Sequence, residues 1–355
     1  MTEVPVSPES HRTGGFDVIE FDGPADRWDK SVSETPGSSF CHLAGWREIM
    51  VDVLGHECRY LVAQDDTGMW RGLLPLVHVK SRLFGHYLLS MPFLNYGGPI
   101  GSAGAQTRLV EYAIDQARRA NVDLLELRSR SPVPADVTVS GRKIAVILDL
   151  PSSPEQLWRE QFPGKLRSQI RRPQKEGMEV QFGPEQVEPF YEVFKRNMRD
   201  LGTPVLPLSF FEGLRLTFGE LVMFGTVYWR GQPVAAGAGF LWRDEFEMTW
   251  ASALREHNRM APNMLLYWAF MEAMIARGVQ FFNFGRCTPN EGTHRFKRQW
   301  GGRDVPLPWA QWTARNLTAT PSPDRPLFRA ATAVWKRLPL LVTNRVGPIL
   351  ARRLP

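Results

Sequence analysis

The chain repeats one pattern of expected strands and helix, and this repeat constrains its fold more than any other feature. In the first half, ECRYLVAQDDTGMWRGLLPLVHVK predicts a hairpin, AQTRLVEYAIDQARRA a helix and VDLLELRS a strand. In the second half, LVMFGTVYWRGQPVAAGAGFLWRDEFEMTWASA predicts three strands, PNMLLYWAFMEAMIARG a helix and VQFFNFGR a strand. Aligning residues 121–125 with residues 278–282 brings the two helix-to-strand units into register. We therefore expect two copies of one α/β fold.

The order of the elements within each copy indicates the fold class. Several antiparallel strands, then a helix, then a strand that is apolar on both faces are typical of an acetyltransferase-like sheet, whereas a doubly wound sheet alternates strand and helix throughout. We predict an α/β (α+β) protein with two such domains, each a mixed, mostly antiparallel sheet flanked by helices. The expected divisions are a disordered N-terminus at 1–14, domains at 15–150 and 151–315, and a basic amphipathic tail at 316–355. Residues 151–202 are predicted to be helical, with a break near Arg172 because proline follows it.

Composition limits the classes of protein and partner. A chain of 355 residues with 43% apolar and 23% charged residues is typical of a soluble protein of two domains. The N-terminus lacks a signal pattern and no run of 18 apolar residues occurs, so we predict a cytoplasmic location. The net charge of +6 favours anionic partners: nucleic acid, nucleotide-linked substrates or the inner membrane surface. Three widely spaced cysteines without a CxxC pattern support neither a disulfide framework nor a metal site.

Two polar segments are candidates for binding anions. In GKLRSQIRRPQKEGMEV, Arg167, Arg171 and Lys175 are four residues apart, which predicts either a solvated interdomain helix or an anion-binding face. In MPFLNYGGPIG, glycines surround Asn95 and Tyr96, either for close approach of a ligand or for a tight loop. The equivalent segment of the second repeat, ALREHNRMAPN, has no glycine, which argues against ordinary coenzyme A binding there.

The segment FFNFGRCTPNEGTHRFKRQWGG ends the second repeat. Strand alternation predicts Arg286 on the face of Phe282 and Phe284, at the end of a strand where ligands commonly bind. A helix over 293–300 would fix Lys297 between two buried aromatic residues. Residue type alone favours a surface role for Lys297 and for His294.

Five segments together resemble a known family. They are LFGHYLLSMPFLNYGGPIG, LRSQIRRPQKEGMEV, NMRDLGTPVLP, NMLLYW and FNFGRCTPNEGTHRFKRQWGG. Over residues 15–312 the chain resembles the FemAB-related proteins found with bacterial exosortase/PEP-CTERM and exopolysaccharide systems and, more distantly, the FemABX peptidyltransferases. The resemblance implies tandem GNAT-like domains, the second of them catalytic. The Phe-Lys pair of FemABX proteins falls on Phe296 and Lys297, while the arginine of their Pro-Arg-Gly-Pro loop is replaced by Gly97, which argues against a muropeptide nucleotide acceptor.

The function that the resemblance implies is transfer of an acyl or aminoacyl group to an amine of a cell-envelope or exopolysaccharide precursor. Lys297 would stabilise the oxyanion, and Glu291 or His294 would relay the amine proton. The expected substrate-binding residues are Arg286, Arg167, Arg171, Asn95 and Tyr96. No cofactor would be bound permanently, because aminoacyl-tRNA or acyl-CoA would act as donor cosubstrate. The acceptor would be a small molecule or a lipid- or nucleotide-linked glycan, and no DNA partner is predicted.

Two other functions remain open. One is an acetyl-CoA-dependent GNAT N-acetyltransferase acting on an amino sugar. The other is a non-catalytic, membrane-associated adaptor of a polysaccharide system. From Arg325 to Pro355 there are seven Arg or Lys residues and no acidic residue, among scattered apolar side chains. This tail would either lie peripherally on the inner face of the inner membrane or pack back across the first domain.

Overall fold

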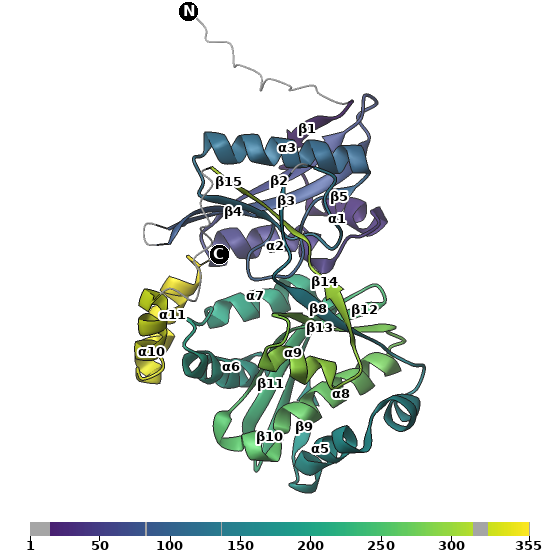
Figure 1. Cartoon of the computed structure of the whole chain (residues 1–355), viewed down its shortest axis with the longest axis vertical. Coiled ribbons are helices and arrows are strands. Elements are labelled where there is room, and N and C mark those ends of the chain that lie inside the picture. Colours follow the sequence, from purple (N-terminus) through teal and green to yellow (C-terminus); the bar gives the residue numbers. More distant parts are fainter. Residues whose placement is uncertain (1–14, 82–83, 136, 315–325, 355) are drawn as a thin grey trace, which may run out of the picture.

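The computed structural model describes residues 15–81, 84–135, 137–314 and 326–354, and its two sheets are each flanked by helices (Figure 1). The first sheet has the strand order β1-β2-β3-β4-β6-β15-β7, with β5 paired to β3. Its strands are β1 (Asp17–Glu20), β2 (Glu57–Gln64), β3 (Trp70–Ser81), β4 (Gly85–Leu89), β5 (Ile100–Gly101), β6 (Leu124–Leu127), β15 (Trp309–Thr313) and β7 (Thr138–Ser140). The predicted fold class is confirmed, and the expectation for residues 1–14 lies outside the described residues.

The second sheet has the order β14-β8-β13-β12-β11-β10-β9. Its strands are β14 (Arg303–Pro306), β8 (Ile144–Asp149), β13 (Phe281–Cys287), β12 (Glu245–Ala253), β11 (Gln232–Trp242), β10 (Val222–Trp229) and β9 (Glu179–Phe182). Each sheet has one parallel pair, β4 with β6 and β12 with β13, and its other pairs are antiparallel. The parallel pair in each sheet is joined through one long helix, α3 (Ala103–Arg119) or α8 (Pro262–Ala276).

The two helix-to-strand units are in the register predicted from the sequence. Both helices end at a residue with left-handed backbone, Asn121 with φ 50° and Gly278 with φ 75°. The parallel pairing then begins at Leu124 in the first sheet and at Phe281 in the second, which are the same distance from those ends. The strand β4, which the predicted first pattern lacked, is the counterpart of β12.

The two halves of the chain exchange one strand. β8 precedes the expected boundary at residue 150 but pairs with β13 and β14 of the second sheet, whereas β15 returns to pair with β6 and β7 of the first. The expected division at residue 150 and the assignment of residues up to 315 to the second domain therefore do not follow the sheets. The exchanged strands supply partners for backbone groups at the outer edges of β6 and β13, a long-range pairing that local patterns do not reveal.

Three apolar clusters hold the layers together. α3 covers the outward face of the first sheet, and α8 with α5 (Gly164–Lys175) covers the outward face of the second (Figure 1). The inward faces share one core with α1 (Ala25–Glu34), α2 (Gly45–Glu48), α6 (Val187–Leu201) and α7 (Leu208–Phe218). In that core Phe40 stacks on Phe240 at a centroid distance of 4.2 Å, so the two domains pack against each other directly.

The region predicted to be helical over 151–202 contains α5 and α6 but is interrupted by β9. The predicted break near Arg172 is wrong, because α5 continues through Pro173 to Lys175. Pro173 lies in the last turn of α5. Its missing N–H removes one hydrogen bond, and because the helix ends there, no further turn is disrupted. Its carbonyl accepts from the Met178 N–H at 3.0 Å, which turns the chain towards β9.

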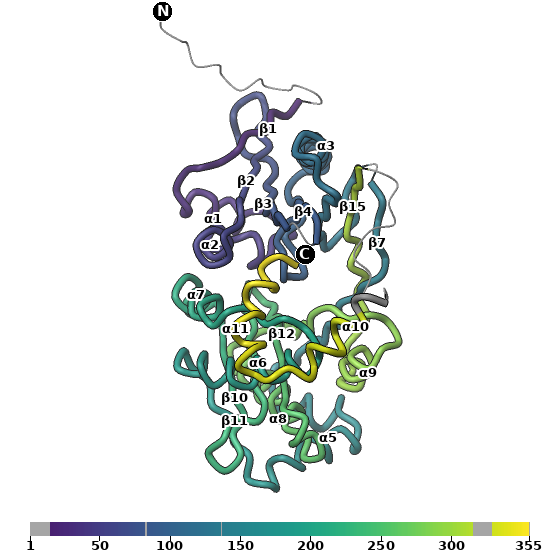
Figure 2. Tube along the Cα trace, turned by 90° about the vertical axis from the view of Figure 1, so that its left-hand side faces the viewer, coloured from purple at the N-terminus to yellow at the C-terminus, as the bar shows by residue number. Residues whose placement is uncertain are grey.

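The C-terminal segment forms two helices, α10 (Pro326–Trp335) and α11 (Leu340–Ala351). α11 packs on α6 of the second domain, and Arg199 of α6 donates to the Leu338 carbonyl at 3.4 Å. Figure 2 shows both helices along the second domain, with the C-terminal end reaching the first domain. Ala351 joins the core that the two domains share. The segment thus packs chiefly on the second domain rather than across the first.

Candidate active site

A strained loop after β4 carries Asn95 and Tyr96 to the boundary between the domains. Its Met91 has left-handed backbone with φ 84°, a conformation that persists only where the surroundings enforce it. Here Arg128 enforces it, because its guanidinium donates to the carbonyls of Met91 at 3.3 Å and Leu94 at 2.9 Å. The loop therefore has one defined position, with both polar side chains turned towards the second domain.

The glycines of this loop serve its packing. A Cβ at Gly97 would collide with the carbonyl oxygen of Ser90, and a Cβ at Gly98 would collide with the side chain of Ser129. The carbonyl of Gly98 also binds Nε2 of buried His42 at 2.9 Å. Of the two interpretations that the sequence left open, these contacts favour the tight loop.

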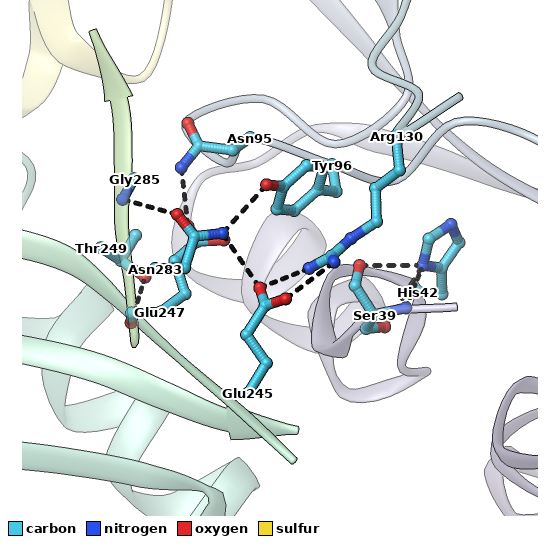
Figure 3. A network of polar contacts seen from close by, with 10 residues as sticks. All are labelled: Ser39, His42, Asn95, Tyr96, Arg130, Glu245, Glu247, Thr249, Asn283 and Gly285. Atoms are coloured by element: carbon cyan, nitrogen blue, oxygen red, sulfur yellow. Dashed lines mark hydrogen bonds and ion pairs between the residues drawn. The ribbon is translucent and has the colours of Figure 1, made fainter. Parts of the chain in front are cut away.

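A buried polar network joins the loop to β12 and β13 (Figure 3). Asn283 donates from Nδ2 to the Tyr96 hydroxyl at 3.0 Å and to Glu245 at 2.9 Å. Arg130, just after β6, donates to both oxygens of Glu245 at 2.9 and 2.6 Å, and its guanidinium lies 4.0 Å from the Tyr96 ring centroid. Burial acts to raise the pKa of Glu245, but the hydrogen bonds and charge of Arg130 outweigh it, and the net shift is downward. The Glu245 carboxylate is thus charged and paired.

Glu247, two residues along β12, is not paired in this way. It is 1% exposed, its Oε1 accepts from Asn95 Nδ2 at 2.6 Å, and its Oε2 has no hydrogen-bond partner. Burial and the neighbouring charge of Glu245 raise the pKa of Glu247 to about 7, against the attraction of Arg130. A carboxyl with this pKa takes up and releases a proton near neutral pH.

Lys297 in α9 (Gly292–Arg298) is the nearby cation. Its Nζ donates to the carbonyls of Gly285 and Arg286, both at 2.8 Å, and the residue is 8% exposed. A Cβ placed on Gly285 would lie 3.9 Å from this Nζ and 3.4 Å from Asn95 Nδ2, so the ammonium group and the amide that binds Glu247 lie on the same side of Gly285. Burial lowers the pKa of Lys297 to about 8, although the charge of Glu247 opposes the shift. The sequence interpretation of Lys297 as a surface side chain is wrong.

Glu291 and His294 lie at the start of α9. Glu291 is the exposed residue that precedes the first turn. His294 accepts from the Asn290 N–H through Nδ1 at 3.0 Å, and its Nε2 lies 3.0 Å from an Asp304 oxygen in β14. Both ring nitrogens are therefore occupied, Nδ1 by the turn before α9 and Nε2 by the sheet. These contacts favour a structural role for His294 over the proton relay predicted from the resemblance.

The predicted face of Arg286 is wrong. Phe282 and Phe284 pack in the core under α8, whereas Arg286 lies on the opposite face of β13, where its guanidinium is 5.3 Å from the Trp309 ring centroid. The cause is a bulge at Gly285, which has φ 71° and adds one residue to β13 relative to β8. The extra residue reverses the alternation, so Arg286 points towards the first domain and not past the sheet edge.

Arg167 and Arg171 line an open cleft of about 550 Å³ along α5. Its other lining residues come from the preceding segment and from α8: Pro154, Glu155, Trp158, Arg159, Trp268 and Glu272. Arg171 stacks 5.2 Å from the Trp158 ring centroid and also borders a second cleft with Arg172 and Lys175. The structure thus separates the predicted substrate-binding residues into two groups, with these arginines on the outer side of the second domain and Asn95 and Tyr96 between the domains.

Sequence reasoning missed the acidic half of the network. The alternation Glu-Phe-Glu-Met places two carboxyls, those of Glu245 and Glu247, on one face of a strand whose other face is apolar. That alternation was the available signal. Arg130 and Asn283 gave none, because their partners lie 115 and 38 residues away in the chain. Within the described ranges, no group of three His, Cys, Asp or Glu side chains is placed to hold a metal ion.

Residues 162–298 match the family model described as the acetyltransferase (GNAT) domain. The matched span contains both carboxyls of β12 and Lys297. No curated protein matches the chain by sequence.

Three solved structures share the fold over most of this chain. FemX has a TM-score of 0.64 at 12% identity and is matched over 88% of this chain and 100% of its own. L-PGS from Bacillus licheniformis has a TM-score of 0.54 at 12% identity, over 91% and 97% of the two chains. A tandem GNAT protein from the clavulanic acid biosynthesis pathway has a TM-score of 0.50 at 13% identity, over 85% and 99%. At these identities the likeness establishes the fold, and it confirms the predicted tandem arrangement.

Proposed function

We propose that this chain transfers an acyl or aminoacyl group to an amine at the network between its two domains. The proposal proceeds from the match of residues 162–298 to the acetyltransferase (GNAT) domain and from the tandem fold. The observation that carries the proposal is the buried Glu247 carboxyl, with one oxygen unpartnered, next to the buried Lys297 ammonium group. Ionisable groups with strongly shifted pKa values cluster at functional sites, because catalysis needs groups that exchange protons near neutral pH.

Glu247 is suited to accept the proton of the acceptor amine. An amine attacks a carbonyl carbon only in its neutral form, and most alkylamines are protonated at neutral pH. The free Oε2 of Glu247 takes one proton from the ammonium group of the acceptor. The neutral acceptor nitrogen then forms the new C–N bond. Asn95 holds the other carboxyl oxygen, which fixes the direction of Oε2.

Lys297 is suited to stabilise the charge that develops next. Attack on the carbonyl creates a negative oxygen, and a positive group held in a water-poor site stabilises it strongly. The carbonyls of Gly285 and Arg286 orient the Lys297 ammonium group before the substrate reacts. The intermediate then collapses: the bond to the donor's oxygen or sulfur breaks, and that atom takes the second proton of the attacking nitrogen as it leaves. The Glu247 carboxyl then releases its proton to solvent.

The donor's phosphates are best accommodated away from the start of α8. There the backbone N–H groups of His257, Ala261 and Met264 already donate to carbonyls of their own loop at 3.0 to 3.1 Å. This leaves fewer donors for a pyrophosphate than a glycine-rich loop offers. The Arg167 and Arg171 cleft offers guanidinium groups and indole rings instead. We favour aminoacyl-tRNA as donor for this reason and retain acyl-CoA as the alternative, which the GNAT match supports.

The acceptor class that we propose is an amine-bearing precursor of the cell envelope or of an exopolysaccharide. This rests on the resemblance of the five segments quoted above. It is supported by the replacement of the family's loop arginine with Gly97, which the loop packing requires to be small. An acceptor other than the muropeptide nucleotide is therefore expected.

The first test is turnover by the full chain with each donor. The purified protein is incubated with aminoacyl-tRNA or acetyl-CoA and with UDP-linked amino sugars, and products are identified by mass spectrometry. We expect a new amide with one donor. Binding of acceptors without any amide from either donor would contradict the proposal and favour the adaptor.

The second test isolates the proton acceptor. We expect Glu247→Gln to lose most activity with an alkylamine acceptor and to retain it with hydroxylamine, which is already deprotonated at neutral pH. Glu220→Gln, at an exposed glutamate, serves as the control and should behave like the unmodified protein with both acceptors. Equal losses with both acceptors would show that Glu247 acts by supporting the loop and not by taking a proton.

A further inference from the structure

The C-terminal helix α11 has one face that is fixed to the protein. Thr343, Gly347 and Ala351, spaced by four residues, are its buried residues. A Cβ at Gly347 would lie 3.1 Å from Val205, so glycine permits close approach of the helix at this point. Because these contacts fix the rotation of α11 about its axis, the direction of its other face is also fixed.

The opposite face of α11 is apolar and exposed. Leu341 is 86% exposed and Ile349 48%, and Val342 and Val346 are also exposed. Val342 and Val346 are four residues apart, and Leu341 and Ile349 are eight residues apart with Arg345 between them, so the apolar side chains form a stripe of two adjacent rows. Val334 at the end of α10 is 59% exposed and adds to the apolar surface of the segment.

Positive charge accompanies this stripe. Arg345 is exposed and lies four residues from both Leu341 and Ile349. From residue 325 to the end, the sequence has seven Arg or Lys residues and no acidic residue. A helix of 12 residues with an apolar stripe and a basic residue within it fits the interface of a lipid bilayer, which is apolar inside and carries negatively charged groups at its surface.

We propose that the outward face of α11 rests on a lipid bilayer that contains anionic headgroups. A helix needs about 20 residues to span the hydrocarbon layer, so α11 would lie in the interface. Among the described residues, no helix combines the length and apolarity of a membrane span. Leu341 and Ile349 enter the acyl region while Arg345 contacts phosphate groups. Charge complementarity favours lipid over a second copy of this chain, whose own tail is equally positive.

The test uses the full chain and vesicle flotation. We expect the protein to float with phosphatidylcholine vesicles that contain 30% phosphatidylglycerol and to remain unbound with phosphatidylcholine alone. Leu341→Ser with Ile349→Ser should lower the partition coefficient roughly tenfold or more, because two large apolar side chains no longer enter the bilayer. Arg345→Gln should lower it about fivefold. Met69→Ser, at an exposed residue in the turn between β2 and β3, is the matched control and should bind like the unmodified protein.

These substitutions keep the buried face of α11 intact, so the fold and transfer between soluble substrates should be unchanged. Equal binding to both vesicle types, or unchanged binding by the Leu341 and Ile349 double variant, would overturn the proposal. So would a dimer in analytical ultracentrifugation that the double variant abolishes while vesicles bind neither form, because the stripe would then be a protein interface.

Discussion

The two domains contain equivalent strand-helix-strand units but differ in the partners that surround a buried carboxyl group. In the first domain, one carboxyl oxygen of Glu126 accepts from Arg128 at 2.8 Å and the other accepts from Gln311 at 2.7 Å. In the second, Glu247 has Asn95 on one oxygen and no partner on the other, and its nearby cation, Lys297, is bound to carbonyls. The first arrangement balances its charge and holds a loop in place. The second leaves one buried carboxyl oxygen without a partner beside a buried cation, which destabilises the fold and makes the carboxyl reactive.

The same substitution in the two domains should therefore have opposite effects on stability. Glu126→Gln leaves the buried Arg128 without its countercharge and should lower the free energy of unfolding by about 3 to 5 kcal/mol. Glu247→Gln removes a costly charge. Because the folded-state pKa of Glu247 is raised from 4.5 to about 7, its stabilising contribution is complete below pH 4.5 and is lost as the pH rises through 7. Above pH 8 the variant should gain up to about 3 kcal/mol.

Urea unfolding at pH 5 and pH 8.5 measures this contrast. The gain for Glu247→Gln should be present at pH 8.5 and small at pH 5, whereas the loss for Glu126→Gln should persist at both. A loss of stability for Glu247→Gln at pH 8.5 would contradict the interpretation that its charge is uncompensated.

The cation of the second domain can be removed in the same way. Lys297→Met should retain the fold, since the methionine can fill the same space, and should retain substrate affinity. We expect kcat to fall about a hundred- to a thousandfold, as it does when one oxyanion donor is lost. Isothermal titration gives the affinity and single-turnover kinetics the chemical step. Full activity in this variant would remove Lys297 from the mechanism.

The sequence predicted the parts of the molecule that depend on local periodicity. The hairpins, both long helices and their register followed from apolar spacing and from the residues at 121 and 278, where a left-handed backbone ends each helix. The exchange of β8 and β15 could not be predicted, because it depends on which sheet edge is free after folding. Lys297 was singled out only by the family resemblance, since spacing alone favoured a surface lysine.

The prediction for Arg286 failed for a related reason. Alternation along β13 is reliable only while no residue is added, and the bulge at Gly285 adds one. Glu247 was not singled out because its distinguishing feature is an Oε2 without a hydrogen-bond partner. A sequence does not reveal such an absence. The sequence also brought forward Glu291 and His294, and these side chains lie at the start of α9.

The pH dependence of kcat/KM is the smallest of these expected effects, and it depends on both Glu247 and Lys297. Glu247 acts as a carboxylate, so activity should fall as the pH drops below about 7, and Lys297 acts as an ammonium group, so activity should fall as the pH rises above about 8. The result is a narrow bell that declines about tenfold per pH unit on each side. Because the two charges interact, the limbs report the pair, and each variant identifies one limb. Glu247→Gln should flatten the acidic limb and Lys297→Met the alkaline limb, each at its lower rate. A profile that is flat from pH 6 to 9 would mean that activity depends on the charge of neither group, and the second domain's site would then be as inert as the balanced pair of the first.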